Sequence, residues 1–176
     1  MKRIALAALL ASTVVSASAQ VYVGGALGLT NIECPANVAN CDTSDVGLKA
    51  SLGYRINRLV SLEGSYIDFG KSKFNALFVG GSQGVSGFLV NAALRHDFNS
   101  TLTGVGRLGL AVLDTELRVG SVSRTENSTN LYFGLGLEYA LAKNLKGTAG
   151  ADFTTAEFQG QSQAVRMFSL GAQYDF

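Results

Sequence analysis

The stretch VGLKASLGYRI, from Val46 to Ile56, decides the fold class because its side chains alternate between two kinds at every step. The even-numbered positions hold Val, Leu, Ala, Leu, Tyr and Ile, and the odd-numbered positions hold Gly, Lys, Ser, Gly and Arg. Successive side chains of a β-strand point to opposite faces of its sheet. An alternation this strict therefore predicts a strand with one apolar face.

The same period of two recurs in seven further segments of the chain. They lie at 21–29, 60–66, 88–95, 102–112, 131–139, 145–153 and 168–176. Frequent glycine makes these segments poor helices, so the sequence predicts an all-β, eight-stranded antiparallel barrel. The expected connections are short turns near 57–58, 99–100 and 142–144, and long links at 31–44, 70–84, 115–128 and 158–163. Short turns at one end and long links at the other are typical of a transmembrane β-barrel.

The composition of the two faces indicates which of them meets the interior. One face carries Leu, Val, Phe or Tyr at most positions, and the other carries mostly Gly, Ala, Ser and Thr with few charges. Small residues suit the narrow interior of an eight-stranded barrel, and bulky apolar residues suit lipid. The alternative is a soluble, lipocalin-like barrel with the two faces reversed, whose surface would then be unusually poor in charge.

Aromatic side chains on the apolar face gather at two heights, as in the two girdles of a transmembrane barrel. The girdle expected near the short turns contains Tyr54, Phe98, Tyr139, Tyr174 and Phe176, and the one toward the long links contains Tyr66, Phe88, Phe133 and Phe153.

Residues 1–19 are predicted to be a cleaved signal peptide, which leaves 20–176 as the barrel domain. A basic start, Met1-Lys2-Arg3, precedes the mostly apolar run Ile4–Val15 and the small-residue cleavage pattern Ala17-Ser18-Ala19. The apolar run is too short for a transmembrane helix, which needs about 20 residues.

The charge balance argues against a nucleic-acid partner. The 176 residues contain 14 Lys and Arg against 13 Asp and Glu, for a formal net charge of +1. Such a balance provides no electrostatic attraction toward a polyanion.

Several segments resemble the transmembrane domain of OmpA and related small outer-membrane β-barrels of the porin family. They are LEGSYIDFG at 62–70, GRLGLA at 106–111, GLEYA at 136–140 and the C-terminal Tyr174-Asp175-Phe176. The resemblance implies a monomer in the outer membrane of a Gram-negative bacterium, in contact with lipid and lipopolysaccharide. It also implies that Tyr174 and Phe176 form the C-terminal signal read by the barrel assembly machinery. Implied roles are structural support or surface interaction through the extracellular loops, with a host or cell-surface partner.

The same resemblance implies a cluster of ion pairs inside the barrel. Glu63, Arg107 and Glu138 match family positions, with Arg107 expected as the central cation, aided by Lys49 or by Arg55, Arg95 or Lys146. A charge walled off by lipid must find a partner, and one guanidinium can bridge two carboxylates. Two interpretations stay open: the cluster only satisfies buried charges, or it plugs a narrow gated ion channel.

The remaining candidate residues lie outside this cluster. Cys34 and Cys41 are the only cysteines, and an even pair in an exported protein predicts a disulfide. Phe74, Leu77 and Phe78 form an apolar patch in an expected loop, where binding sites commonly lie. His96, the only histidine, is expected near the membrane surface at the periplasmic end. We expect no catalytic residues, metal site, cofactor or enzymatic activity.

Overall fold

The computed structural model describes residues 20–32, 41–42, 44–76, 79–119, 122–158 and 161–176. The predicted signal peptide at 1–19, Cys34, Leu77 and Phe78 lie outside these ranges, as do the side chains of Cys41 and Phe74. The predicted disulfide and apolar loop patch therefore fall outside the described residues. The described ranges contain no helix of the length and apolarity needed to cross a membrane.

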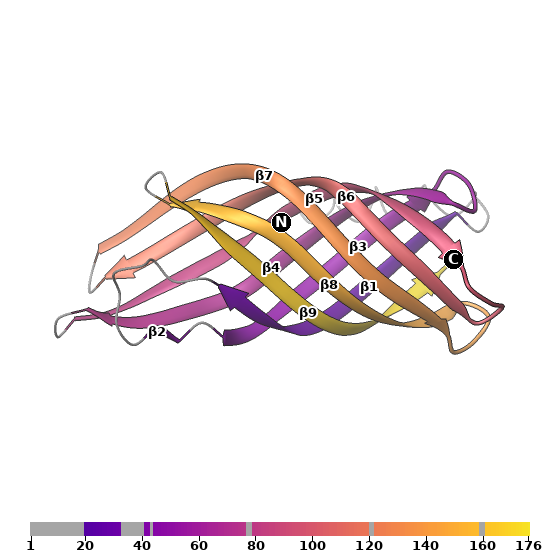
Figure 1. The fold of residues 1–176 in the computed structure, drawn as a ribbon, viewed down its shortest axis with the longest axis horizontal. Helices are drawn as coiled ribbons and strands as arrows, with labels where there is room; N and C mark the ends of the chain where they lie inside the picture. The colour runs from indigo at the N-terminus through magenta and orange to yellow at the C-terminus, as the bar shows by residue number, and fades with distance from the viewer. Residues whose placement is uncertain (1–19, 33–40, 43, 77–78, 120–121, 159–160) are drawn as a thin grey trace, which may run out of the picture.

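The described chain consists of strands joined by short turns (Figure 1). The strands are β1 (Val21–Ile32), β2 (Cys41–Asp42), β3 (Ser44–Arg55), β4 (Val60–Ala76), β5 (Val79–Asp97), β6 (Leu102–Val119), β7 (Val122–Ala140), β8 (Leu145–Phe158) and β9 (Gln161–Asp175). All are long except β2, which has 2 residues and pairs with the far end of β4.

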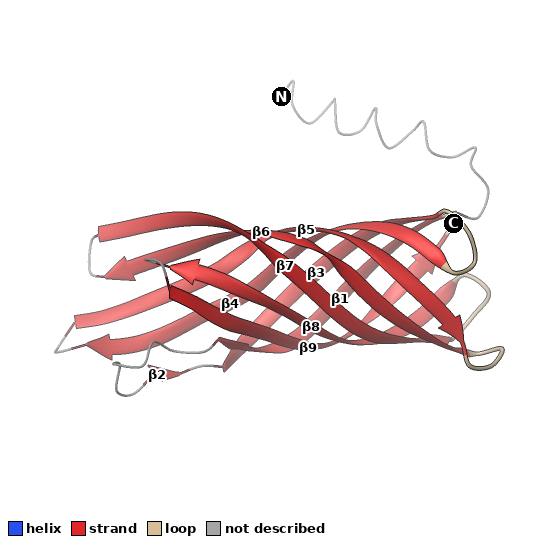
Figure 2. Ribbon diagram, turned by 45° about the horizontal axis from the view of Figure 1, so that its top comes forward, coloured by secondary structure: helices blue, strands red, loops and turns tan. Residues whose placement is uncertain are grey.

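The eight long strands close into one antiparallel barrel, as the sequence predicts. Their order is β4-β3-β1-β9-β8-β7-β6-β5, and pairing of β4 with β5 completes the ring. The first and last long strands meet along one seam, where Val23 pairs with Tyr174 and Ala26 with Gly171. Figure 2 shows the strands tilted against the long axis of the barrel. Closure leaves no strand edge facing the bilayer at the height of the seam.

Three turns lie at one end of the barrel, which we call the turn end. They span 56–59, 98–101 and 141–144. In the first two turns an asparagine carbonyl oxygen accepts backbone N–H groups at 2.8 Å, from Val60 to Asn57 and from Leu102 to Asn99. Each asparagine therefore stabilises the reversal of the chain.

Three of the four long links predicted for the opposite end are wrong, because strands extend into most of their residues. β4 ends at Ala76 and β5 begins at Val79. In the same way, β6 ends at Val119 and β7 begins at Val122, and β8 ends at Phe158 and β9 begins at Gln161. These hairpins keep pairing their backbones beyond the regular apolar alternation that the sequence pattern detects. A bulge between Asp68 and Lys71, with Gly70 at a φ of 78°, shifts the register as β4 enters this region. β4–β7 therefore project beyond β8 and β9 as a protruding sheet (Figure 1).

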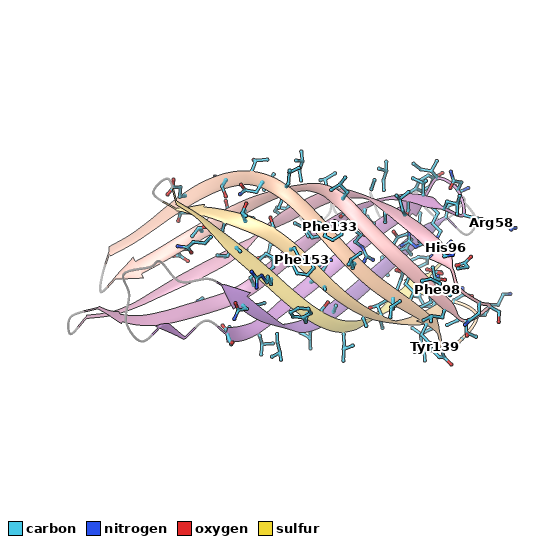
Figure 3. The ribbon with its side chains drawn as sticks, viewed as in Figure 1. Arg58, His96, Phe98, Phe133, Tyr139 and Phe153 are labelled. Atoms are coloured by element: carbon cyan, nitrogen blue, oxygen red, sulfur yellow. The ribbon has the colours of Figure 1, made fainter. Side chains whose placement is uncertain are left out.

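The bulky apolar face of each of the eight long strands points away from the barrel axis, so the soluble alternative with reversed faces is wrong. Leu131 and Leu170, for example, are each 73% exposed. Aromatic side chains lie on this outer wall: Phe98 and Tyr139 near the turn end, and Phe133 and Phe153 farther along (Figure 3). Phe153 contacts the rings of both Phe133 and Phe168 at 6.3 Å between centroids. The outer surface suits lipid over the height between these aromatic groups.

The interior is charged toward the turn end and mostly apolar farther from it, where buried uncharged polar residues such as Thr115 and Thr154 lie among the apolar ones. The inward side chains of β4 run from Ser61 and Glu63 to Ile67 and Phe69, all buried. One cluster of buried apolar side chains fills the upper part: Ile67, Phe69, Val85, Leu89, Ala111, Leu113, Tyr132, Ala156, Val165 and Met167.

Candidate functional site

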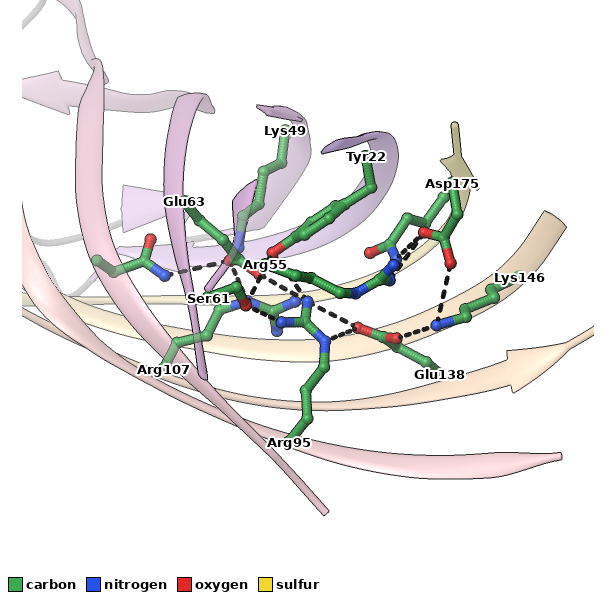
Figure 4. A network of polar contacts seen from close by, with 12 residues as sticks. Tyr22, Lys49, Arg55, Ser61, Glu63, Arg95, Arg107, Glu138, Lys146 and Asp175 are labelled. Carbon is green, nitrogen blue, oxygen red and sulfur yellow. Dashed lines mark hydrogen bonds and ion pairs between the residues drawn. The ribbon is translucent and has the colours of Figure 1, made fainter. Parts of the chain in front are cut away.

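A network of charged side chains lies in the part of the barrel interior nearer the turn end, which we call the lower part (Figure 4). Adjacent strands supply its members. Each member stands at an inward position, and inward positions alternate with lipid-facing ones along a strand. Glu63 comes from β4, Arg95 from β5, Arg107 from β6, Glu138 from β7 and Lys146 from β8. Neither glutamate is more than 3% exposed, so each depends on its partners inside the barrel.

Arg95 holds the central position that the sequence analysis assigned to Arg107. Its guanidinium lies 3.0 Å from Glu63 and 3.1 Å from Glu138, so it bridges the two buried carboxylates. It also donates hydrogen bonds to the hydroxyls of Ser61 and Tyr22.

Arg107 binds Glu63 instead, with Nε at 2.7 Å from Oε2. The reason is a difference in height. Arg107 pairs across the β6–β7 ladder with Gly134, whereas Glu138 pairs with Thr103, four residues farther along β6. Four strand residues span about 13 Å, so Arg107 lies higher in the barrel than Glu138.

Tyr22 is a member of the network that the sequence analysis missed. Its hydroxyl donates a 2.5 Å hydrogen bond to Glu63, and Arg55 and Arg95 lie 4.8 Å from its ring centroid. Gly53 on the adjacent strand leaves room for this ring, since a Cβ there would lie 2.0 Å from the tyrosine Cζ. The inward parity of Tyr22 was available from the sequence, but its depth and direction were not.

Lys49 belongs to a second, higher cluster and not to the Glu63 group. Its Nζ lies 2.6 Å from Asp152 and 3.0 Å from the hydroxyl of Tyr132, which also donates to Asp152. Asp152 is therefore a partner of Lys49 that was not predicted from the sequence.

Toward the turn end the network ends in Asp175, which the sequence analysis also missed as a charge partner. Arg55 lies 2.8 Å from its carboxylate and Lys146 lies 3.3 Å from it. Lys146 also reaches Glu138 at 3.0 Å, so these charges continue the network to the mouth of the barrel.

A small cavity lies between the two clusters. Its volume is about 50 Å³, and Lys49, Glu63, Arg107 and Asp152 are among the residues that line it. Asp152 is 2% exposed, and its Oδ2 has no hydrogen-bond partner within the part of the chain that the structure describes. A polar cavity of this size holds water.

In the protruding sheet, the feature of interest is the backbone of β7 beyond its ladder with β8. The ladder between β7 and β8 ends at Tyr132 and Thr154, where the Thr154 hydroxyl donates to the carbonyl of Leu131 at 3.0 Å. The ladder between β7 and β6 continues beyond this point to Val122. Among the residues that the structure describes, β7 therefore presents an open backbone edge around Thr129, above the aromatic level of Phe133. At the other side of the sheet, β2 pairs with β4.

His96 lies on the outer wall near the turn end (Figure 3). Its ring packs against Phe98 at 5.4 Å between centroids, in a T-shaped arrangement. Over the described ranges no group of three His, Cys, Asp or Glu side chains could hold a metal ion.

The sequence matches the outer membrane protein beta-barrel domain family over residues 4–176. A comparison with curated protein sequences found no relative at a significant level.

Among solved structures, Neisserial surface protein A is similar, with a TM-score of 0.68 and 18% identity over 89% of this chain and 97% of that one. Ail, the attachment invasion locus protein of Yersinia pestis, has a TM-score of 0.61 and 16% identity over 90% and 99%. The N-terminal barrel of Pseudomonas aeruginosa OprF has a TM-score of 0.60 and 18% identity over 90% and 98%. At these identities the likeness concerns the fold.

Proposed function

Because the chain belongs to the outer membrane protein beta-barrel domain family, we propose that it is an integral outer-membrane barrel that interacts with other proteins through its protruding sheet. The observation that carries this proposal is the open edge of β7 around Thr129, above the end of the β7–β8 ladder at Tyr132. An exposed edge can accept an extended peptide as an additional strand. Similar structures include a protein described as a surface protein and one described as an attachment invasion protein, which supports a role at the surface.

Shortening the β6–β7 hairpin tests this function. Leu113 pairs with Ser128, so residues 114–127 can be replaced by Asn-Gly, a two-residue hairpin turn. Bacteria that display this variant are expected to lose adhesion to cultured epithelial cells, because residues 122–127, the larger part of the open edge of β7, are removed. The barrel below the hairpin is expected to keep its heat-dependent gel mobility.

The matched control shortens the neighbouring hairpin. Lys71 pairs with Gly84, so replacing residues 72–83 by Asn-Gly lowers the sheet and keeps the β6–β7 hairpin. Adhesion is expected to persist in this control. An equal loss in both variants would assign the interaction to the height of the sheet, and full adhesion in both would leave a structural role. Phe74, Leu77 and Phe78 lie in the control segment, so the control also tests the proposed apolar patch.

The export and assembly of the chain belong to the same proposal. We infer that residues 1–19 are removed on export and that Tyr174 and Phe176 direct assembly. Their rings pack at 5.2 Å, and Phe176 is 60% exposed on the outer wall. Contact with lipopolysaccharide, a monomeric state, the Cys34–Cys41 disulfide and the absence of enzymatic activity stay predictions.

Replacing Phe176 by alanine is expected to lower the amount of assembled barrel in cells severalfold. Refolding of the purified variant into detergent is expected to proceed normally, because the side chain faces away from the packed interior. Phe98→Ala, which removes an aromatic of the same girdle away from the C-terminus, is the control. An equal deficit in both variants would contradict a signal at the C-terminus.

A second candidate function is a narrow gated ion path, which the cavity beside Arg107 and Asp152 favours. The conductance series described below tests this function.

A further inference from the structure

Away from the turn end, the inward side chains change from charged to mostly apolar, with a few buried uncharged polar residues such as Thr30, Asn130 and Thr154 among them. This change carries an inference beyond the proposed surface role. We propose that an apolar layer above the charge network is a separate barrier that seals the barrel against ions. One representative of the layer from each of six strands is Phe69, Leu89, Leu113, Tyr132, Ala156 and Met167.

The apolar side chains of this layer are closely packed. Phe69, Leu89, Leu113 and Met167 have no exposed surface, although they line the interior of a barrel. An ion that crosses such a layer loses its hydration and finds few polar partners, all on uncharged side chains such as Asn130 and Thr154, which is strongly unfavourable. Apolar constrictions close channels by excluding water in the same way.

The two remaining strands complete the layer through glycine. β1 supplies Gly28 and β3 supplies Gly47, and these two residues pair with each other. The Met167 methyl carbon would lie 2.9 Å from a Cβ on Gly28, and its sulfur 3.2 Å from a Cβ on Gly47. Met167 therefore occupies the space that side chains on β1 and β3 would fill, so all eight long strands contribute to the closure.

Tyr132 marks the lower boundary of this layer. Its ring belongs to the apolar cluster, and its hydroxyl contacts Lys49 and Asp152 in the polar part. The small cavity lies below this hydroxyl, and below the cavity lies the bridge of Arg95 between Glu63 and Glu138. The interior thus contains two barriers in series, the ion-pair network and the apolar layer, with a polar cavity of about 50 Å³ beside the ion pairs. Breaking the ion pairs alone leaves the apolar layer in place.

The test compares four purified full-length proteins in planar lipid bilayers: the unaltered chain, an ion-pair variant, a seal variant and the combination. The ion-pair variant is Arg95→Gln with Glu138→Gln, which removes the bridge and keeps side chains of similar size. The seal variant is Leu89→Ser with Leu113→Ser, two neighbouring positions on β5 and β6. Phe69→Ala with Met167→Ala is a second seal variant, used if the first does not fold. Heat-dependent gel mobility verifies the barrel in each sample.

The ion-pair variant is expected to conduct no more than the unaltered chain, and the combination at least about tenfold more. A similar rise in the seal variant alone would also support the proposal, because it places the main barrier in the apolar layer. Conductance in the ion-pair variant equal to that of the combination would overturn it. So would a folded combination that conducts no more than the unaltered chain.

Discussion

Replacing Arg95 with alanine is expected to lower the free energy of unfolding of the barrel by about 3 kcal/mol, near the lower end for breaking a buried ion pair. Arg95 is the bridge between Glu63 and Glu138, and its side chain is 5% exposed. Its removal leaves both carboxylates buried with fewer partners. The loss stays near the lower end because Arg107 still holds Glu63 and Lys146 still holds Glu138.

The measurement is urea unfolding of the barrel in lipid vesicles, followed by the folded band on gels. Arg107→Ala is expected to cost less than Arg95→Ala, because Arg107 contacts one of the two glutamates through its ion pair and is 14% exposed. Arg58→Ala, at an exposed turn residue, controls for loss of an arginine elsewhere. A larger effect at Arg107 than at Arg95 would show that the central cation has been misassigned.

Replacing Gly171 with alanine is expected to destabilise the barrel by about 3 kcal/mol, the upper range for overpacking, because it forces the closing seam apart. Gly171 on β9 pairs with Ala26 on β1. A Cβ at Gly171 would lie 2.1 Å from the carbonyl oxygen of Gly25 and 2.7 Å from the Cα of Ala26. Both atoms belong to the backbone of β1, so rotation of a side chain cannot relieve the contact.

Gly25→Ala is the matched control, since it changes the same residue type on the opposite strand of the same seam. A Cβ at Gly25 meets nothing within 4 Å, so this variant is expected to fold like the unaltered chain. Refolding yield and urea midpoint of the two variants give the comparison. Equal stability of Gly171→Ala and Gly25→Ala would show that the seam tolerates wider strand spacing.

The cavity and the apolar layer also bear on whether the charge network serves stability or ion conduction. Arg95 and its two glutamates satisfy one another inside a lipid-enclosed space, and that requirement holds whether or not ions pass. A stabilising network below an apolar seal accounts for the buried charges without a pore. The two sets of variants separate these roles, because stability and conductance are measured on the same substitutions at Arg95.

The sequence by itself determined the eight barrel strands over their regularly alternating parts, the direction of each face and the three short turns, but not how far the strands extend at the opposite end. Val46–Ile56 alternates because each strand residue points opposite to its neighbour, which is a local property of extended backbone. The outward Leu and aromatic positions and the inward position of Glu63, Arg107, Glu138 and Lys49 all follow from that alternation. Asn57 and Asn99 mark two turns for an equally local reason, the hydrogen bonds of their own side chains.

Only the tertiary structure decided which inward residues meet. The stagger between strands sets their relative heights, and it is a property of the closed barrel rather than of any segment. This stagger places Arg95 rather than Arg107 between Glu63 and Glu138, and it brings Lys49 to Asp152, 103 positions away in the chain. It also gathers Phe69, Leu89 and Met167 into one layer. An apolar residue among small polar ones on a single strand gives no sign of that layer, because the layer exists only when the ring closes.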